Sequence, residues 1–425
     1  MQYTLRGSRK LLVVLGASSL AVLAALALVI GSSANASAKH AKRVAHRAAS
    51  PPSISSINWG TAHGQTVKLY TLESGNGMTV KITNYGGIIQ SIWVPDRNGN
   101  VANVALGFRS LDDYVNDFEH QPWPAPGGSG KTYFGAAIGR YANRIADHSF
   151  TLNGHHYVLV GNNGPNNVNT LHGGPNSWET QIWEPSTKQT GKSVSLVLKH
   201  TDPNGYNGFP GNLHVTVTYE VTSGNALEVQ WRATTDAPTV INVTQHTYFN
   251  LAGEASGPIY NQLLQLNANE FTPTDATLIP TGQFVPVAGT PFDFTHLHAI
   301  GDRILDASAP WGSQLTTAHG YDHNWVLNGP NGVLKVAATA VDPASGRAVT
   351  TYTTEPGIQV YTSNFLVGDL VGSSGHIYRQ TAAFTLETQH FPDTPHHIGD
   401  PRWPSVVLNP GQMFHSTTIY QFGTK

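Results

Sequence analysis

Two polar side chains in otherwise apolar, strand-like segments have the chemistry of an acid–base pair. His246 lies in INVTQHTYFNLAG, which starts at Ile241, and Glu387 lies in AAFTLETQHFPD, which starts at Ala382. A carboxylate that accepts a proton and an imidazole that donates one can together catalyse a reaction that moves protons. Each residue also has a structural alternative, because a histidine on a strand is often a hydrogen-bonded packing residue and a glutamate can pair with an arginine.

Strand alternation predicts which neighbours share a face with each member of the pair. Around His246 one face is polar and the other apolar: Asn242, Thr244, His246 and Tyr248 against Ile241, Val243 and Phe249. Around Glu387, Thr385 and Gln389 share its face, whereas Phe384 and Leu386 point away. The two segments are therefore predicted to be strands that each present one polar face.

Three further segments place polar residues in apolar or glycine-rich surroundings: IGRYANRI with Arg140 and Arg144, LHGG with His172, and GYDHNW with Asp322. An arginine is rarely buried without a partner, and its planar fork suits paired oxygens, so either arginine could bind a ligand or form a structural ion pair. The glycines beside His172 let the backbone approach a ligand closely. The HGG and DHN fragments are short enough to occur by chance, so no single fragment decides the function.

The elements that must position these residues are predicted to be β-strands. The 425 residues include 43 Gly and 26 Pro but only 12% charged residues, and apolar and polar residues alternate between short turn-forming clusters. No segment of the body shows convincing helical periodicity, and no repeat of fixed period indicates a propeller. The sequence predicts an all-β protein with one large antiparallel domain over residues 57–425, in which the Pro- and Gly-rich stretch 119–131 is a surface loop.

The composition excludes several classes of function. The chain has no Cys, which rules out thiol catalysis and thiolate metal ligands. The body lacks the basic run that is typical of a nucleic-acid partner. It also lacks a P-loop, a dinucleotide fingerprint and an HExxH motif.

The first residues have the order of a secretory signal peptide. Arg6, Arg9 and Lys10 precede an apolar run over residues 11–30, and small residues with A-x-A spacing follow at residues 34–38. We expect residues 1–38 to be removed on export and residues 39–56 to form a disordered basic linker. The alternative is an uncleaved anchor, because about 20 apolar residues can span a bilayer. The expected location is secreted, that is periplasmic or extracellular, with or without such an anchor.

The body of the chain resembles the aldose 1-epimerase (galactose mutarotase) family. Beyond the segments above, family-like pieces follow in the family's order: NGFPGNL from Asn207, FTPTDATLIPTG from Phe271, GTPFDF from Gly289, TTEPGIQVYTSNFL from Thr353 and PSVVLNPGQ from Pro404. The resemblance implies a β-supersandwich with the sugar site on the concave face of one sheet. It also implies a free monosaccharide as the substrate, and neither a metal nor an organic cofactor.

The same resemblance implies the roles of individual residues. Glu387 matches the family's general base and His246 its general acid. The sugar-contacting positions are matched by Asn143, Arg144, His172, Tyr248, Asp322 and Gln359. The chain departs from the family pattern at Gln245, Trp178 and Asn261-Gln262, and none of these changes removes a catalytic position.

The implied activity is the interconversion of the α and β anomers of a free hexose such as galactose or glucose. It would start with Glu387 ionised and His246 protonated. A secreted carbohydrate-binding protein is one alternative, but it would not need both residues. A glycoside hydrolase or lyase is another, although a hydrolase normally needs two carboxylates that flank the bond. An epimerase of sugar phosphates is disfavoured because no extra basic cluster is present.

Overall fold

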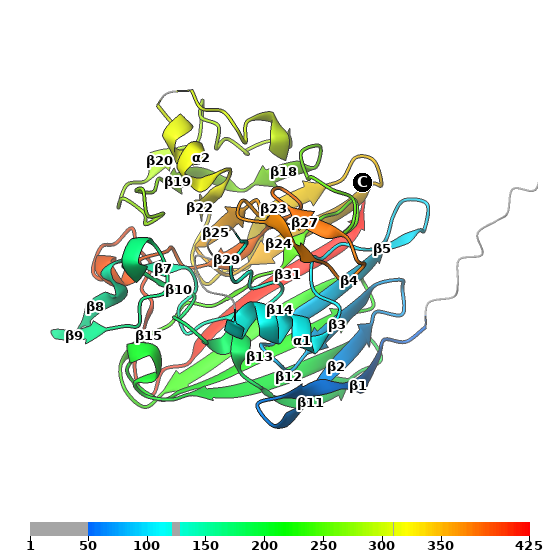
Figure 1. Ribbon diagram of the computed structural model, residues 1–425, viewed down its shortest axis with the longest axis horizontal. Coiled ribbons are helices and arrows are strands. Elements are labelled where there is room, and N and C mark those ends of the chain that lie inside the picture. Colours follow the sequence, from blue (N-terminus) through cyan, green and yellow to red (C-terminus); the bar gives the residue numbers. More distant parts are fainter. Residues whose placement is uncertain (1–49, 121–127, 309) are drawn as a thin grey trace, which may run out of the picture. The chain divides into compact units, whose positions relative to one another are not determined.

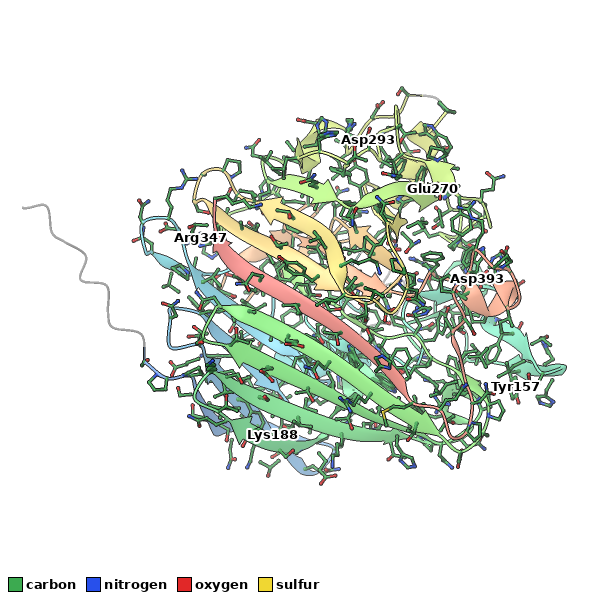
Figure 2. The ribbon with its side chains drawn as sticks, turned by 180° about the vertical axis from the view of Figure 1, so that it is seen from behind. Tyr157, Lys188, Glu270, Asp293, Arg347 and Asp393 are labelled. Atoms are coloured by element: carbon green, nitrogen blue, oxygen red, sulfur yellow. The ribbon has the colours of Figure 1, made fainter. Side chains whose placement is uncertain are left out.

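Strands dominate the computed structural model, which describes residues 50–120, 128–308 and 310–425 (Figure 1). The largest sheet has nine strands in this order: β11 (Glu184–Gln189), β12 (Ser193–Asp202), β13 (Leu213–Thr222), β14 (Ala226–Thr235), β31 (Phe414–Thr424), β24 (Arg347–Thr353), β23 (Lys335–Val341), β18 (Leu263–Leu266) and β21 (His298–Ala299). Neighbouring strands run antiparallel, and Figure 2 shows this sheet from behind. The all-β antiparallel fold is confirmed.

Alternating side chains explain why this sheet forms. On β13, Val215, Val217 and Tyr219 are buried, whereas the residues between them are only half-buried. Val217 pairs with Trp231 of β14, and Tyr219 pairs with Val229. Apolar cross-strand pairs on one face stabilise adjacent strands and fix their register, because a slip by one residue would turn every apolar side chain outward.

A second antiparallel sheet is built from consecutive strands near the start of the described chain. Its strands are β1 (Ser53–Ala62), β2 (Gln65–Glu73), β3 (Thr79–Thr83), β4 (Ile89–Pro95) and β5 (Val101–Asn103). Strand β1 begins inside the segment 39–56 that the sequence predicts to be linker, with Ser53 opposite Glu73. Most side chains of this edge strand are exposed, so its sequence lacks a burial pattern and pairing with β2 holds it in place.

A third sheet carries several of the residues that the sequence singles out. Its antiparallel order is β20 (Val285–Pro286), β19 (Ala268–Thr272), β22 (Asp322–Leu327), β25 (Gly357–Tyr361) and β29 (Glu387–Gln389). All five residues of β25 are buried, so this strand is covered on both faces. The polar side chains on one of these faces must therefore find partners within the protein or bind a ligand.

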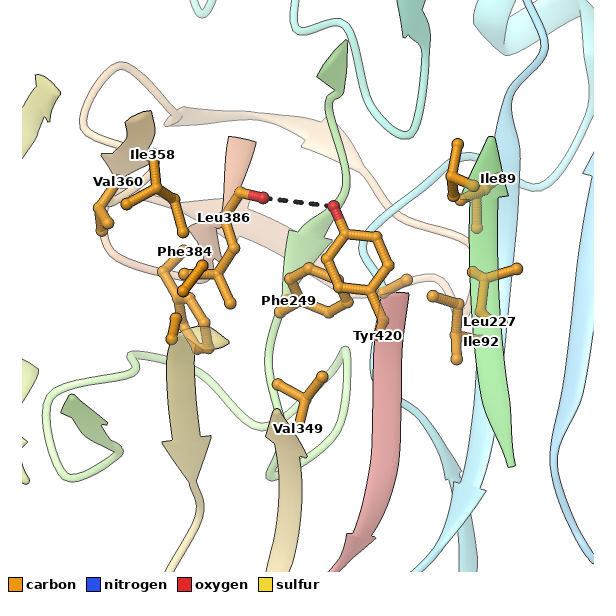
Figure 3. Close-up of a cluster of buried hydrophobic side chains, with 14 of the residues drawn as sticks. Ile89, Ile92, Leu227, Phe249, Val349, Ile358, Val360, Phe384, Leu386 and Tyr420 are labelled. Atoms are coloured by element: carbon orange, nitrogen blue, oxygen red, sulfur yellow. Dashed lines mark hydrogen bonds between the residues drawn. The ribbon is translucent and has the colours of Figure 1, made fainter. Parts of the chain in front are cut away.

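Apolar side chains from all three sheets meet in one core (Figure 3). Phe384 and Leu386 enter this core beside Phe249, as strand alternation predicts. Tyr420 of β31 packs against Phe249 with ring centroids 5.3 Å apart, and its hydroxyl donates to the carbonyl oxygen of Leu386 at 3.2 Å. The core thereby ties the strand before Glu387 to the nine-stranded sheet.

Two short α-helices, α1 (Leu111–Val115) and α2 (Gly312–Ala318), correct the expectation that the body contains no helix. Neither is long enough to show helical periodicity in its sequence. Helix α1 begins at a capping box, in which Ser110 and Asp113 exchange side-chain and backbone hydrogen bonds. No helix in the described part of the chain has the length and apolar character needed to cross a membrane.

The stretch 119–131, predicted to be a surface loop, is only partly described. Glu119 ends up in the π-helix η1 (Asn116–His120), and residues 121–127 lie outside the described residues. The far end of the stretch is not at the surface, because Lys131 is buried with its ammonium group 2.7 Å from Glu179. A buried lysine needs such a carboxylate partner, and no local pattern predicts a partner 48 residues away.

Arg140 is a structural residue, which settles one of the alternatives left open by the sequence. Its guanidinium is fully buried and contacts both carboxylate oxygens of Asp202 at 3.1 Å. The indole of Trp178 donates to the same carboxylate at 2.9 Å. Trp178 also packs on Gly139, where an added Cβ would lie 2.1 Å from the ring. The tryptophan that departs from the family pattern thus belongs to the packing behind the 138–145 segment.

We predict that Asp202→Asn lowers the free energy of unfolding by about 3–5 kcal/mol, because it leaves a buried guanidinium charge without its partner. The matched control is Glu270→Gln, which breaks the pair with Arg402 where the side chains are 34% and 51% exposed. That change should cost less than about 1 kcal/mol. Equilibrium unfolding in denaturant measures both values, and equal losses would show that Arg140 does not depend on Asp202.

Candidate active site

Strands β22, β25 and β29 bring three predicted residues to one face of their sheet. Gln359 pairs in register with both Asn324 and Glu387, so these residues form a row across the three strands. Asp322 lies two positions before Asn324 and therefore shares its face. The side-chain amide of Gln359 donates to Oδ1 of Asp322 at 2.7 Å. Segments far apart in the sequence thus converge because their strands are adjacent.

Arg144 reaches Asp322 from a separate two-stranded ladder. Strand β7 (Arg144–Ile145) pairs with β10 (Thr170–Leu171). The guanidinium lies 3.4 Å from Oδ2 of Asp322 and donates to Oδ1 of Asn163 at 3.0 Å. Asn143, at φ 64°, accepts the backbone N–H of Arg144 with its side-chain oxygen at 2.8 Å. Arg144 is therefore held by polar partners at both ends of its guanidinium while it lines the cavity described below.

His172 follows β10 and is a hydrogen-bond donor to the site. Its Nδ1 accepts the backbone N–H of Asn143 at 3.2 Å. Burial lowers the pKa of His172 well below its usual value, and the charges of His246 and Arg144 act in the same direction. The ring is therefore neutral near pH 7, and with Nδ1 occupied as an acceptor its proton resides on Nε2.

Pairing of two short strands places His246 beside Glu387. His246 lies between β16 (Thr244–Gln245) and β17 (Tyr248–Phe249), and β17 pairs with β28 (Phe384–Thr385). Nε2 of His246 is 3.6 Å from Oε1 of Glu387. Thr385, which the sequence places on the same face as Glu387, donates its hydroxyl to that same oxygen at 2.8 Å. The predicted acid and base are therefore neighbours, 4% and 1% exposed.

Burial opposes charge on both members of the pair. It raises the pKa of Glu387 to about 8, although the Thr385 hydroxyl works in the opposite direction. It lowers the pKa of His246 to about 3. The expectation of an ionised Glu387 and a protonated His246 in the resting site is thus opposed by burial. It is favoured by their mutual attraction and, for Glu387, by the Thr385 hydroxyl and the charge of Arg144. Once charged, however, the glutamate is a stronger base and the imidazolium a stronger acid than in water.

Seven of the eight predicted residues line one cavity of about 530 Å³, a volume that includes the solvent at its open side: Asn143, Arg144, His172, His246, Tyr248, Asp322 and Glu387. Gln359, the eighth, contacts the cavity through Asp322. The structure thus brings together residues whose convergence in space the sequence alone could not establish.

Several residues that line the cavity were not predicted, among them Lys131, Tyr133, Tyr361 and Leu366. The ring of Tyr133 lies edge-on to His172 with centroids 4.7 Å apart, and 5.9 Å from the ring of His246. Tyr133 stands in an apolar run that looks like ordinary core, so its sequence context carried no signal. Lys131, at the end of the stretch 119–131 that the sequence predicts to be a surface loop, also lines the cavity.

Three side chains of the cavity are of residue types that commonly bind metal ions. Ligand atoms of His172, His246 and Glu387 lie within 4.8 Å of one another, the one such group among the described residues. A histidine ligand must offer a free lone pair. His172 already uses Nδ1 as an acceptor and carries its proton on Nε2, so metal binding would require breaking its bond with Asn143. The hydrogen bonding of His172 therefore suits a hydrogen bond from its Nε2 to a polar substrate better than it suits metal ligation.

Comparisons with known proteins show the family of this chain. The family model for aldose 1-epimerase matches residues 68–421. Galactose mutarotase of Rattus norvegicus is 38% identical over 359 residues, which cover 84% of this chain and 95% of that protein. Aldose 1-epimerase of Escherichia coli K12 is 35% identical over 361 residues, covering 84% and 96%. The crystal structure of galactose 1-epimerase from Lactobacillus acidophilus has a TM-score of 0.73 at 26% identity, covering 88% and 99%. The chain belongs to the aldose 1-epimerase family of isomerases.

Proposed function

We propose that this protein interconverts the α and β anomers of a free hexose, with galactose and glucose as the first sugars to test. The observation that carries the proposal is the buried pair of Glu387 and His246, 3.6 Å apart in a cavity lined with hydroxyl-binding groups. The C1 hydroxyl oxygen and the ring oxygen of a pyranose are bonded to the same carbon. An acid and a base that serve both oxygens must therefore be close neighbours.

Ring opening requires two proton transfers at these oxygens. Glu387 takes the proton of the C1 hydroxyl, and His246 gives a proton to the ring oxygen as the bond from C1 to that oxygen breaks. Rotation about the C1–C2 bond exposes the other face of the aldehyde, and the reverse transfers close the ring as the second anomer. Each positioned proton transfer contributes about 10²- to 10⁴-fold to the rate.

The other cavity residues suit the hydroxyl groups of a hexose. Arg144 and His172 offer donors, whereas Asp322 offers acceptors and is already held by Arg144 and Gln359. Tyr133 presents an aromatic surface beside the histidines, against which the C–H face of a sugar can pack. Since both transition and ground states carry these hydroxyls, the residues contribute to sugar binding more than to the chemical step.

The pair must hold one proton to react. Burial sets the limits of this state at a pKa of about 3 for His246 and about 8 for Glu387. Below the lower value the pair takes up a second proton, and above the upper value it loses its last one. The rate is therefore expected to fall as the pH rises through about 8, whichever of the two residues carries the proton in between.

The alternatives fit the geometry less well. A carbohydrate-binding protein has no use for a buried acid–base pair. A glycoside hydrolase needs two carboxyl groups about 5–5.5 Å or about 6.5–9.5 Å apart and free to act. The second carboxylate of this cavity, Asp322, is engaged by Arg144 and Gln359 instead.

We also propose that the protein is exported. The support is the order of basic residues, apolar run and A-x-A spacing over residues 1–38. Mass spectrometry of the protein from its native host should find a mature chain that begins near Lys39 outside the cytoplasm. Recovery of the intact amino terminus in the membrane fraction would instead identify an anchor.

Glu387 and Arg144 have different proposed roles, proton transfer and sugar binding, and substitutions at the two positions should therefore differ in effect. Glu387→Gln keeps the shape of the side chain but cannot take the hydroxyl proton, so kcat should fall by at least about 10²-fold with sugar binding little changed. Arg144→Ala should mainly weaken sugar binding, because the guanidinium holds ground and transition states alike.

Polarimetry on freshly dissolved α-galactose and α-glucose measures the rates, and calorimetric titration with the same sugars measures binding. A near-normal kcat in a folded Glu387→Gln variant would show that Glu387 has a structural role and is not the base. Absence of anomer exchange by the wild-type protein on both sugars would remove the support for these two substrates.

A further inference from the structure

The hydroxyl of Thr385 accepts one hydrogen bond and donates one to the carboxylate of Glu387. The backbone N–H of Tyr361 donates to Oγ1 of Thr385 at 3.2 Å, and Oγ1 lies 2.8 Å from Oε1 of Glu387. A backbone N–H can only donate and an ionised carboxylate can only accept, so the hydroxyl oxygen accepts the bond from Tyr361 and its single proton goes to the ionised glutamate. Thr385 is fully buried, so no water competes for this arrangement.

The two oxygens of the Glu387 carboxylate are therefore not equivalent. Oε1 receives the Thr385 hydroxyl, whereas Oε2 is buried and has no hydrogen-bond partner within the described residues. A buried carboxylate oxygen without a partner costs free energy unless something supplies a donor. In the proposed reaction the C1 hydroxyl of the sugar would be that donor.

We propose that Thr385 is a positioning residue for anomer exchange, which holds Oε1 of Glu387 and leaves Oε2 to take the proton from the C1 hydroxyl. The proposal rests on the proposed function of the site. Threonine suits this task better than serine, because its β-branch restricts χ1 and so keeps the hydroxyl in one orientation. The pairing of Thr385 with Tyr248 between β28 and β17 further fixes its backbone.

The Thr385 hydroxyl also lowers the pKa of Glu387, as one of several nearby groups that shift it. Burial raises the pKa of the carboxyl, Thr385 lowers it, Asp322 raises it and Arg144 lowers it. The other titratable groups around the carboxylate are His246, His172, Tyr248, Tyr361 and Tyr420. Burial raises the pKa of each of the three tyrosines, so they remain uncharged near neutral pH. Removal of the Thr385 hydroxyl should therefore raise the pKa of Glu387.

The test is Thr385→Val, which keeps the side-chain shape and removes the donor. We expect kcat to fall by about 10- to 100-fold, the usual effect of losing a hydrogen bond to a charged group. The fall in rate at alkaline pH should move to higher pH than in the wild type. Thr385→Ser should restore most of the activity and the wild-type profile. If the Val variant does not fold, Thr385→Ala carries the same expectation.

The matched control is Thr351→Val. Thr351 is equally buried, on β24, and its hydroxyl has no partner in the described part of the chain. The same chemical change there should leave kcat and the pH profile unchanged. The proposal would be overturned if Thr385→Val had the kcat of the wild type and the same fall in rate at alkaline pH. It would also be overturned if the Ser and Val variants lost kcat equally and the fall in rate stayed at the same alkaline pH, because that result would indicate a packing role alone.

A second readout separates this proposal from the proposed function. Infrared spectra taken across the pH range follow the protonated carboxyl of Glu387, which is identified by its absence in Glu387→Gln. The midpoint of this titration should lie at higher pH in Thr385→Val than in the wild type, and an identical midpoint would overturn the role of Thr385. If the wild-type protein exchanges no anomers, the proposed function fails, and the infrared titration still tests the hydrogen bond.

Discussion

The site depends on a carboxylate and an imidazole that are held together where water cannot solvate either charge. Burial alone would keep both Glu387 and His246 neutral, since it raises the pKa of the first to about 8 and lowers that of the second to about 3. Their separation of 3.6 Å favours the opposite, an ion pair. A pair balanced between these tendencies can pass a proton to a substrate and recover it with little change in solvation, which is what a reversible ring opening requires.

The remainder of the fold keeps these two residues in place. His246 sits between two short strands, and one of them pairs with the strand that leads into Glu387. The apolar neighbours of Glu387, Phe384 and Leu386, are anchored in the core, where the Tyr420 hydroxyl binds the Leu386 carbonyl. Since the nine-stranded sheet supplies Tyr420, the large sheet stabilises the site without contributing a side chain to the cavity.

Much of this arrangement can be predicted from the sequence, because strand alternation is a local property. It assigned Thr385 and Glu387 to one face and Phe384 and Leu386 to the other, and resemblance assigned all eight site residues. The features that the sequence does not predict depend on long-range contacts. Arg140 pairs with Asp202, whereas Arg144 faces the cavity. Tyr133 lies beside the histidines, and Lys131 is buried against Glu179. Strand β1 could not be predicted because most of its side chains are exposed, and the two helices could not because they are too short to show a helical period in the sequence.

The central claim is that Glu387 and His246 act as one unit, and a double-mutant cycle tests it most directly. Exchange rates of the galactose anomers at equilibrium, measured by two-dimensional NMR, would be compared for the wild type, Glu387→Gln, His246→Gln and the double variant. If either loss disables the unit, the double variant should be within about threefold of the slower single variant. Losses that multiply would show that the two residues contribute independently, and would contradict a shared proton transfer.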